Sequence, residues 1–221
     1  MIKSIYGSLV LLALLVSGCL PAHAPSRDPE TLIIDNELVL SLVLPENGWE
    51  LAREAPDFLV RQIVNHLREE AVASGLRLND RQLQQVARKR LAVNEGFVVN
   101  PDSLAYLMID FRRMSSDEAI PDKDSLIGSA YGAELSLKNE RGVTGVSSKI
   151  RRVRIDGSHL AYRTDIRYRL NGHSRKFVGI IGRIGSYRFY FYFNDLLHDP
   201  VNAEQMNSLF RTLAIRSATS R

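Results

Sequence analysis

The chain has 221 residues, of which 45% are hydrophobic and 24% are charged, and its formal net charge is +4 at pH 7. These fractions are ordinary for a globular domain. The length allows one substantial hydrophobic core or at most two small ones, and it excludes anything larger. The single cysteine, Cys19, excludes an internal disulfide, a metal site built on several cysteines and a redox pair.

The N-terminal segment has the layout of a secretory signal peptide. Lys3 is followed by an apolar core from Leu9 to Val16, and small residues then lead to Cys19. The continuous apolar run is only about 8–10 residues long, which is too short to span a bilayer comfortably, since spanning takes about 20. A plain cleaved signal, an uncleaved anchor and a chance apolar start are the alternatives.

Leu15-Val16-Ser17-Gly18-Cys19 resembles a bacterial lipobox. In that family the peptide is cut before the cysteine, whose thiol is diacylated, with palmitate as the typical acyl group, and whose new amino group is also acylated. The resemblance implies a signal peptide over residues 1–18, a lipidated Cys19 and a periplasm-facing protein anchored in the cell envelope. Leu20, in place of an Asp, favours the outer membrane. Residues 19–30 are rich in proline and are predicted to be the lipidated linker.

Residues 31–217 are predicted to form one domain. Apolar runs at Leu32–Ile34 and Leu38–Leu44 indicate two strands around a turn. A pair of helices follows over residues 57–92. Asp57–Ser74 has an apolar stripe that ends at a glycine, and Asp80–Leu91 is preceded by a capping box of Asn79 and Gln82.

The second half of the domain is predicted to be mostly strand. Phe97–Phe111 is a strand region bent at Asn100-Pro101, and a weaker helix follows Asp122. An antiparallel meander of four strands is predicted over residues 149–194. Its tight turns are Asp156-Gly157, Asn171-Gly172 and Gly185-Ser186. A last helix opens at Asp199-Pro200. The strand Tyr187–Phe193 is apolar or aromatic on both faces, so we expect both faces to be covered.

These elements predict an α+β fold in which helices flank both faces of an antiparallel sheet. The order of elements resembles the PsbP/Mog-type family, which includes DcrB-like lipoproteins. The matching residues are Leu42-Val43-Leu44-Pro45 leading through Gly48 to Trp49, Tyr190-Phe191-Tyr192-Phe193, and the closing helix Ala203–Leu213. The early helical pair departs from the compact family pattern. The resemblance implies a non-enzymatic accessory or binding protein, and it carries over no catalytic residues.

Positive charge is concentrated toward the C-terminus, where residues 149–221 hold 14 Lys and Arg against 5 Asp and Glu. Two-residue turns at Asp156-Gly157 and Asn171-Gly172 pair Val153 with Leu160, Ile166 with Phe177, and Tyr162 with Ile181 on one side of the sheet. The other side then receives a basic cluster of Arg152, Arg154, Arg163, Arg167, Arg169 and Lys176.

The basic cluster has two interpretations. Arg167 lies directly opposite Lys176 in this register, and a surface that tolerates such repulsion is a candidate for binding an anion. The alternative is an ordinary solvated strand face whose charge Asp165 partly offsets. A three-residue loop at Asp156-Gly157 would move the first strand's arginines to the opposite face and break the cluster.

Other motifs carry little chemistry. His66 and Glu70 are four residues apart on the first predicted helix, but two ligands do not make a metal site, so none is predicted. Asp122 and Asp124 fit helix capping better than a catalytic pair. The glycines from Gly179 to Gly185 lie within strands, so they indicate close packing with aromatic residues, or a bulge, rather than a phosphate-binding loop. Neither a nucleophile motif nor a cofactor motif is present.

The sequence therefore predicts a membrane-anchored envelope lipoprotein that is not an enzyme and serves as an accessory or binding module for an envelope protein complex. The alternative is a protein that binds anionic lipid or glycan through its basic sheet face, and a third hypothesis is a hydrolase whose site is assembled from distant residues. Nucleic acid is not an expected partner, because the predicted location is outside the cytoplasm and the tyrosines fit sheet packing better than base stacking.

Overall fold

The computed structural model describes residues 28–196 and 198–218. Cys19, the signal peptide and most of the predicted linker lie outside these ranges. In chain order the elements are β1 (Glu30–Ile34), β2 (Leu38–Leu42), β3 (Glu50–Ala52), α1 (Asp57–Ala73), α2 (Asp80–Leu91), β4 (Gly96–Asn100), β5 (Ala105–Arg113), α3 (Lys123–Lys138), β6 (Val143–Val153), β7 (Leu160–Leu170), β8 (His173–Ile184), β9 (Tyr187–Asp195), α4 (Pro200–Thr212) and β10 (Ala214–Ser217).

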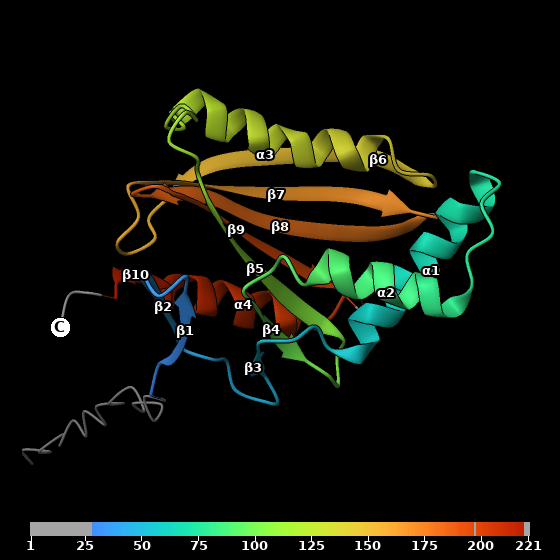
Figure 1. Cartoon of the computed structure of the whole chain (residues 1–221), viewed down its shortest axis with the longest axis horizontal. Coiled ribbons are helices and arrows are strands. Elements are labelled where there is room, and N and C mark those ends of the chain that lie inside the picture. The colour runs from blue at the N-terminus through green and yellow to red at the C-terminus, as the bar shows by residue number, and fades with distance from the viewer. Residues whose placement is uncertain (1–27, 197, 219–221) are drawn as a thin grey trace, which may run out of the picture.

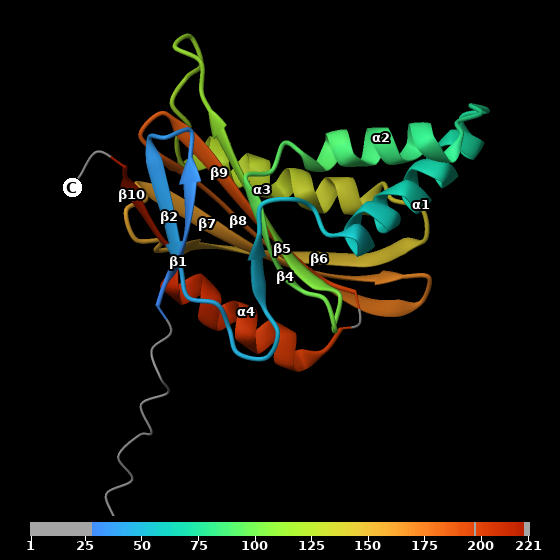
Figure 2. The same cartoon turned by 60° about the horizontal axis from the view of Figure 1, so that its bottom comes forward.

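The strands form two antiparallel sheets. The larger sheet has seven strands in the order β3-β4-β5-β9-β8-β7-β6, and the smaller has three in the order β1-β2-β10. Helix α4 lies on one face of the large sheet, and α1, α2 and α3 lie on the other (Figures 1 and 2). We call these the α4 face and the α3 face. The predicted α+β fold with helices on both faces of an antiparallel sheet is confirmed.

Local sequence signals explain where the helices begin. The Asn79 side chain accepts from the Gln82 backbone N–H and the Gln82 side chain accepts from the Asn79 backbone N–H, which completes the predicted capping box of α2. Asp122 caps α3 by accepting from the Ser125 N–H at 2.8 Å, as predicted. Asp199 caps α4, and Pro200 occupies its first turn. Within the described ranges, no helix combines the length and apolar character needed to cross a membrane.

The predicted turn at Asn171-Gly172 is a two-residue hairpin turn. Leu170 pairs with His173 across it, and both turn residues have positive φ, 51° for Asn171 and 82° for Gly172. This backbone is that of a type I′ turn, whose twist matches the flanking strands. The turn fixes the register of β7 on β8, so the predicted pairs of Ile166 with Phe177 and Tyr162 with Ile181 are confirmed.

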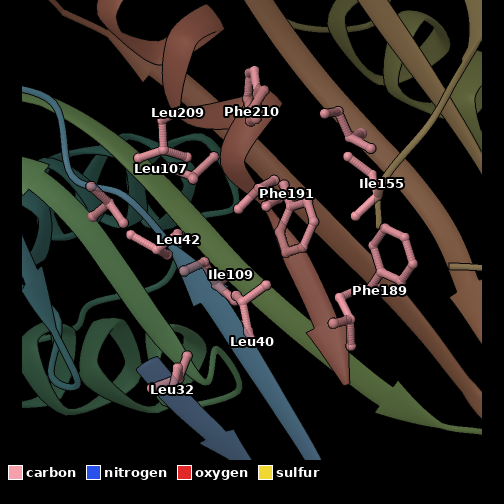
Figure 3. Packing of buried hydrophobic residues seen from close by; sticks show 14 of the residues in the cluster. Leu32, Leu40, Leu42, Leu107, Ile109, Ile155, Phe189, Phe191, Leu209 and Phe210 are labelled. Atoms are coloured by element: carbon pink, nitrogen blue, oxygen red, sulfur yellow. The ribbon is translucent and has the colours of Figure 1, made fainter. Parts of the chain in front are cut away.

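The main hydrophobic core lies between the α4 face, helix α4 and the small sheet. Figure 3 shows Phe189 and Phe191 of β9 meeting Leu40 and Leu42 of β2, with Leu209 and Phe210 of α4 beside them. Trp49 is also buried here, and its indole Nε1–H donates to the Gln205 Oε1 of α4 at 2.7 Å. Leu42, Trp49, Phe191 and Phe193, which belong to the residues that carry the family resemblance, thus converge on one core.

The α3 face is packed less continuously. One cluster joins α1 and α2 to β4 and β5 through Leu59, Leu83 and Phe97, and a separate cluster joins α3 to Tyr162 and Ile181. Strand β9 reflects the difference, because its α4-face residues are buried whereas Tyr190 and Tyr192 on the α3 face are only partly buried. The α4 face of this strand is covered, as expected, whereas its α3 face is covered only in part.

Candidate functional site

The structure brings most of the predicted basic cluster to the α4 face. Strand register places Arg163, Arg167 and Arg169 of β7 on this face, together with Lys176 of β8. Arg167 lies directly opposite Lys176, as predicted. The prediction that these four residues share one face of the sheet is therefore confirmed, and their role in binding an anion stays a prediction.

The prediction is wrong for Arg152. Arg152 pairs with Tyr162, and Val153 pairs with Ala161 rather than with Leu160, so β6 is shifted by one residue from the expected register. A shift of one residue exchanges the two faces of a strand. Arg152 therefore lies on the α3 face, and Arg151 takes its place on the α4 face, opposite Arg163. Arg154 lies beyond the end of β6, in the connection to β7.

The shift occurs because Asp156-Gly157 is not a two-residue hairpin turn. The connection runs from residue 154 to 159, and Ile155 within it is buried in the main core. Asp156 forms an isolated parallel bridge with Ala214, and its carbonyl oxygen accepts from the Ile215 N–H at 2.9 Å. Packing against β10 thus overrides the local turn preference of the dipeptide.

Asp165 is the centre of the basic cluster. Arg163 donates to it through Nε at 3.0 Å and Nη2 at 2.8 Å, while the Arg151 and Lys176 nitrogens lie 3.8 Å from its carboxylate oxygens. The Arg163 side chain is only 9% exposed, and its guanidinium lies 5.5 Å from the centre of the Phe210 ring. Arg163 is therefore a structural residue, held by a carboxylate and an aromatic ring.

Two hollows border these residues. One, of about 450 Å³, is lined by Lys149, Arg151, Arg167 and Lys176, with Asp165 as the one carboxylate in its lining. The other, of about 660 Å³, is lined by Arg151, Arg154 and Arg211 of α4, and Arg152 also borders it. We refer to the exposed cations that line these hollows, apart from Arg152 with its α3-face register, as the basic surface; its members are Lys149, Arg151, Arg154, Arg167, Lys176 and Arg211.

A larger cavity, of about 680 Å³, opens on the α3 face. Helix α3 forms one wall, Gln62 of α1 contributes to the other, and β5, β9, β8 and β7 form the floor. We call it the α1–α3 cavity. Phe177 and Tyr192 lie in the floor with ring centres 5.8 Å apart and an angle of 34° between their planes. Burial raises the pKa of Tyr192 and also that of Tyr168, so both phenols are neutral at physiological pH.

Several polar groups of the α1–α3 cavity lack partners. In the described part of the chain, Gln62 Oε1 and His198 Nε2 are buried atoms without a hydrogen bond. Burial lowers the pKa of His198, and the charge of Arg175 lowers it further, which favours the neutral imidazole. Asp195 Oδ1 accepts from the backbone N–H of His198 at 2.9 Å. A volume of this size with an aromatic floor and a few polar groups is typical of a ligand site.

The other sequence candidates have structural roles. His66 Nε2 lies 3.2 Å from Glu70 Oε1, on an exposed face where Glu70 also contacts Arg90. No three His, Cys, Asp or Glu side chains are grouped as metal ligands within residues 28–196 and 198–218. Gly179 and Gly182 pack against the rings of Phe177 and Phe189, which confirms that these glycines mark close packing.

Sequence reasoning missed the α1–α3 cavity because its lining comes from six elements that are spread along the chain from α1 to β9. One signal was present. Tyrosine occupies the α3-face positions of β9, whereas phenylalanine occupies the buried α4-face positions 189, 191 and 193. Tyrosine has an apolar ring and a polar tip, so it suits a partly solvated surface.

No family model matches the chain, and no curated protein matches it. Several solved structures share its architecture, among them a cyanobacterial and a mycobacterial protein. Cyanobacterial PsbP (CyanoP) from Synechocystis sp. PCC 6803 aligns with a TM-score of 0.50 at 9% sequence identity, over 91% of this chain and 98% of that one. LpqN of Mycobacterium tuberculosis, a protein involved in cell envelope biogenesis, aligns with a TM-score of 0.50 at 14% identity, over 85% and 90% of the two chains. At these identities the likeness establishes a PsbP-like fold.

Proposed function

We propose that this protein is a lipid-anchored, periplasm-facing envelope protein that acts without catalysis, as an accessory module for an envelope protein complex. The basic surface carries the proposal. Of its exposed cations, Arg151 and Lys176 lie 3.8 Å from the Asp165 carboxylate, and a partner with negative charge would relieve the mutual repulsion of the group. The surface is hollowed beside α4, which fits a protruding acidic segment of a protein better than a flat bilayer.

Two observations support the envelope location. The segment ending at Cys19 resembles a lipobox, and the PsbP-like fold is shared with LpqN, which is involved in cell envelope biogenesis. In this proposal Cys19 holds the protein in the membrane through its acyl chains, each buried methylene contributing about 0.8 kcal/mol. Leu20 after the cysteine favours the outer membrane. Residues 28–30 enter the fold at β1, on the opposite side of the molecule from the α1–α2 pair (Figure 1).

The anchor is tested by the intact mass of the membrane-extracted protein and by fractionation of a Cys19→Ala variant. The wild type is expected to begin at an acylated Cys19, and the variant is expected to leave the membrane fraction. An unmodified Cys19 would remove the lipid anchor from the proposal.

Contact with a partner is tested by placing a photo-cross-linking amino acid at Arg167, on the basic surface, in cells that express the full-length chain. The control position is Arg81, an exposed residue of α2 outside the two hollows. The expected result is a cross-link from position 167 to one envelope protein, lost when Arg151 and Lys176 are changed to Ser, and no such product from position 81. Equal cross-linking from both positions, or none from either, would contradict the proposal.

The second candidate function is binding of anionic lipid or glycan by the same surface, since Arg151 lines both hollows and phosphate groups also protrude from a membrane or glycan. The test is co-sedimentation of a full-length Cys19→Ser chain with phosphatidylglycerol vesicles. Replacing Arg151, Arg167 and Lys176 with Ser should abolish salt-sensitive binding. A matched control removes the same charge from α2 and the loop before it, by changing Arg77, Arg81 and Lys89 to Ser, and should bind like the parent. Binding that survives the first triple change excludes this candidate.

A further inference from the structure

The packing of the protein itself does not explain why α3 has a glycine at position 132. Glycine is among the least favourable residues in a helix interior, and α3 runs on both sides of it from Lys123 to Lys138. A Cβ at Gly132 would meet no atom within 4 Å. Because Gly132 lines the α1–α3 cavity, the missing side chain leaves the helix backbone open to whatever enters there.

The open backbone belongs to a longer trough. Four small residues of α3 line the cavity at positions that share one helix face: Ser129, Gly132, Ala133 and Ser136. Leu137, near the end of α3, also lines the cavity, so the helical wall from Ser129 to Leu137 is roughly 12 Å long at 1.5 Å per residue. This length matches about four residues of an extended chain at 3.3 Å each. Figure 1 shows strands β7 and β8 running between α3 and the α1–α2 pair, where this cavity lies.

The floor of the cavity offers apolar contact. Met108, Phe177 and Tyr192 come from three neighbouring strands, and each is only partly buried by the protein. Phe177 and Tyr192 pack side by side, with their rings 5.8 Å apart. An apolar side chain of a ligand would cover these rings and remove their surface from water.

The walls offer hydrogen bonds of both kinds. Among the described residues, Gln62 Oε1 and His198 Nε2 have no hydrogen-bond partner, although the Gln62 side chain is also hydrogen-bonded to the Tyr106 phenol. Asn194, Ser129 and Ser136 add further polar side chains. A ligand that carries both N–H and C=O groups would satisfy such a lining, whereas an acyl chain would leave it unpaired at a cost in free energy.

The charges around the cavity are mixed rather than of one sign. Arg175 and Glu140 both act on Tyr168, and neither forms an ion pair within the described ranges. Asp195 accepts hydrogen bonds from the His198 backbone N–H and from Asn202 Nδ2. The Lys176 ammonium lies 3.8 Å from the carboxylate of Asp165, which belongs to the α4 face. A cavity with one open cation and one open anion favours a ligand without strong net charge.

We propose that the α1–α3 cavity binds an extended peptide segment of a partner protein, laid along the small-residue face of α3 with one apolar side chain on Phe177 and Tyr192. The proposal rests on the proposed function in that its ligand comes from a protein partner, but it uses the sheet face opposite the basic surface. The peptide backbone supplies the N–H and C=O groups that the lining requires, and Gly132 allows its close approach.

The test is a selection of random twelve-residue peptides, displayed on phage, on the immobilised full-length chain. An enriched peptide is then synthesised, and its affinity is measured by calorimetry. Gly132→Leu fills the trough and should weaken binding at least tenfold. Gly128→Leu is the matched control, because Gly128 lies one turn earlier on α3, has open space around its Cβ and does not line the cavity. It should change affinity by less than twofold.

Two outcomes would overturn the inference. The first is a selection that yields no enriched peptide family. The second is a set of enriched peptides that bind the Gly132→Leu variant as well as they bind the wild type. A glycan that binds the wild type and not Gly132→Leu would replace the peptide as the ligand. A variant with Arg151→Ser and Arg154→Ser, neither of which lines the α1–α3 cavity, separates this inference from the proposed function: it should keep peptide affinity while losing the cross-link from position 167.

A stability measurement separates a ligand role of Gly132 from a structural role. Gly132→Ala and Gly128→Ala should each raise the Tm by roughly 2–4 °C, because alanine favours the helix and neither Cβ meets another atom. A fall in Tm for Gly132→Ala would mean that the folded protein itself needs the glycine. Gly132 would then have a structural role and would not indicate a ligand.

Discussion

The two faces of the seven-stranded sheet are built on the same strands but are packed to different degrees. On the α4 face, a single core joins β9 to the small sheet and α4, and even the charged Arg163 is enclosed by Asp165 and Phe210. On the α3 face, two separate clusters leave a cavity of about 680 Å³ between them. The difference indicates that the α4 face provides most of the stability, while the α3 face leaves part of its apolar surface uncovered.

The sharpest test of this comparison uses neighbouring residues of β9 that point to opposite faces. Phe191 is fully buried on the α4 face, so Phe191→Ala should lower the free energy of unfolding by about 3–5 kcal/mol. Tyr192 borders the cavity, and Tyr192→Ala should cost roughly half as much or less, since less surface is buried. Urea unfolding followed by the fluorescence of the single tryptophan, Trp49, measures both. Equal losses would show that the two faces are equally packed.

The connection from β6 to β7 closes one end of the α4-face core, and Gly157 is its tightest point. Gly157 has a φ of 79°, and a Cβ there would overlap the carbonyl group of Ile215. Gly157→Ala should therefore cost about 3 kcal/mol, because backbone strain and overlap act together. Gly172→Ala is the control, with a similar φ of 82° but open space, and should cost about 1 kcal/mol. If Gly157→Ala lowers the free energy of unfolding no more than Gly172→Ala does, the contact with β10 is not the cause of the shifted register.

Within the basic cluster, we expect an enclosed arginine to contribute more to the free energy of unfolding than an exposed one. Arg163→Ala leaves Asp165 with only its two longer contacts and uncovers Phe210, so it should cost about 2 kcal/mol. Arg167→Ala removes an exposed side chain and should change stability by less than about 0.5 kcal/mol. Chemical denaturation of both variants decides between a structural and a surface role. Similar values would mean that Arg163 does not anchor the cluster.

The smallest expected effect concerns Asp110, a partly buried carboxylate of β5 on the α3 face. Burial raises its pKa above the ordinary value of 3.8, and Arg112 opposes the rise. The folded protein therefore binds a proton more tightly than the unfolded chain, so this group lowers stability as the pH rises through the window between the two pKa values. Asp110→Asn should be slightly more stable than the wild type at pH 7, and the difference should vanish below pH 3.8. Thermal unfolding at several pH values measures this, and a variant less stable at pH 7 would contradict it.

Much of the fold was predictable because its signals are local. The capping box of Asn79 and Gln82, the Asp122 cap and the Asn171-Gly172 turn each involve a few neighbouring residues, and each forms as predicted. These signals fix the helix starts and the register of β7 on β8, so they also place Arg163, Arg167 and Lys176 on one face. The sequence by itself therefore determined the fold class and most of the basic cluster.

Only the tertiary structure decided the rest. Asp156-Gly157 has the sequence of a hairpin turn, yet burial of Ile155 and pairing with Ala214 and Ile215 impose a longer connection, which moves Arg152 to the other face. The α1–α3 cavity depends on how far α1 and α3 lie apart on the sheet, which no short segment encodes. Local preferences amount to about 1 kcal/mol or less per residue, so a few buried long-range contacts outweigh them.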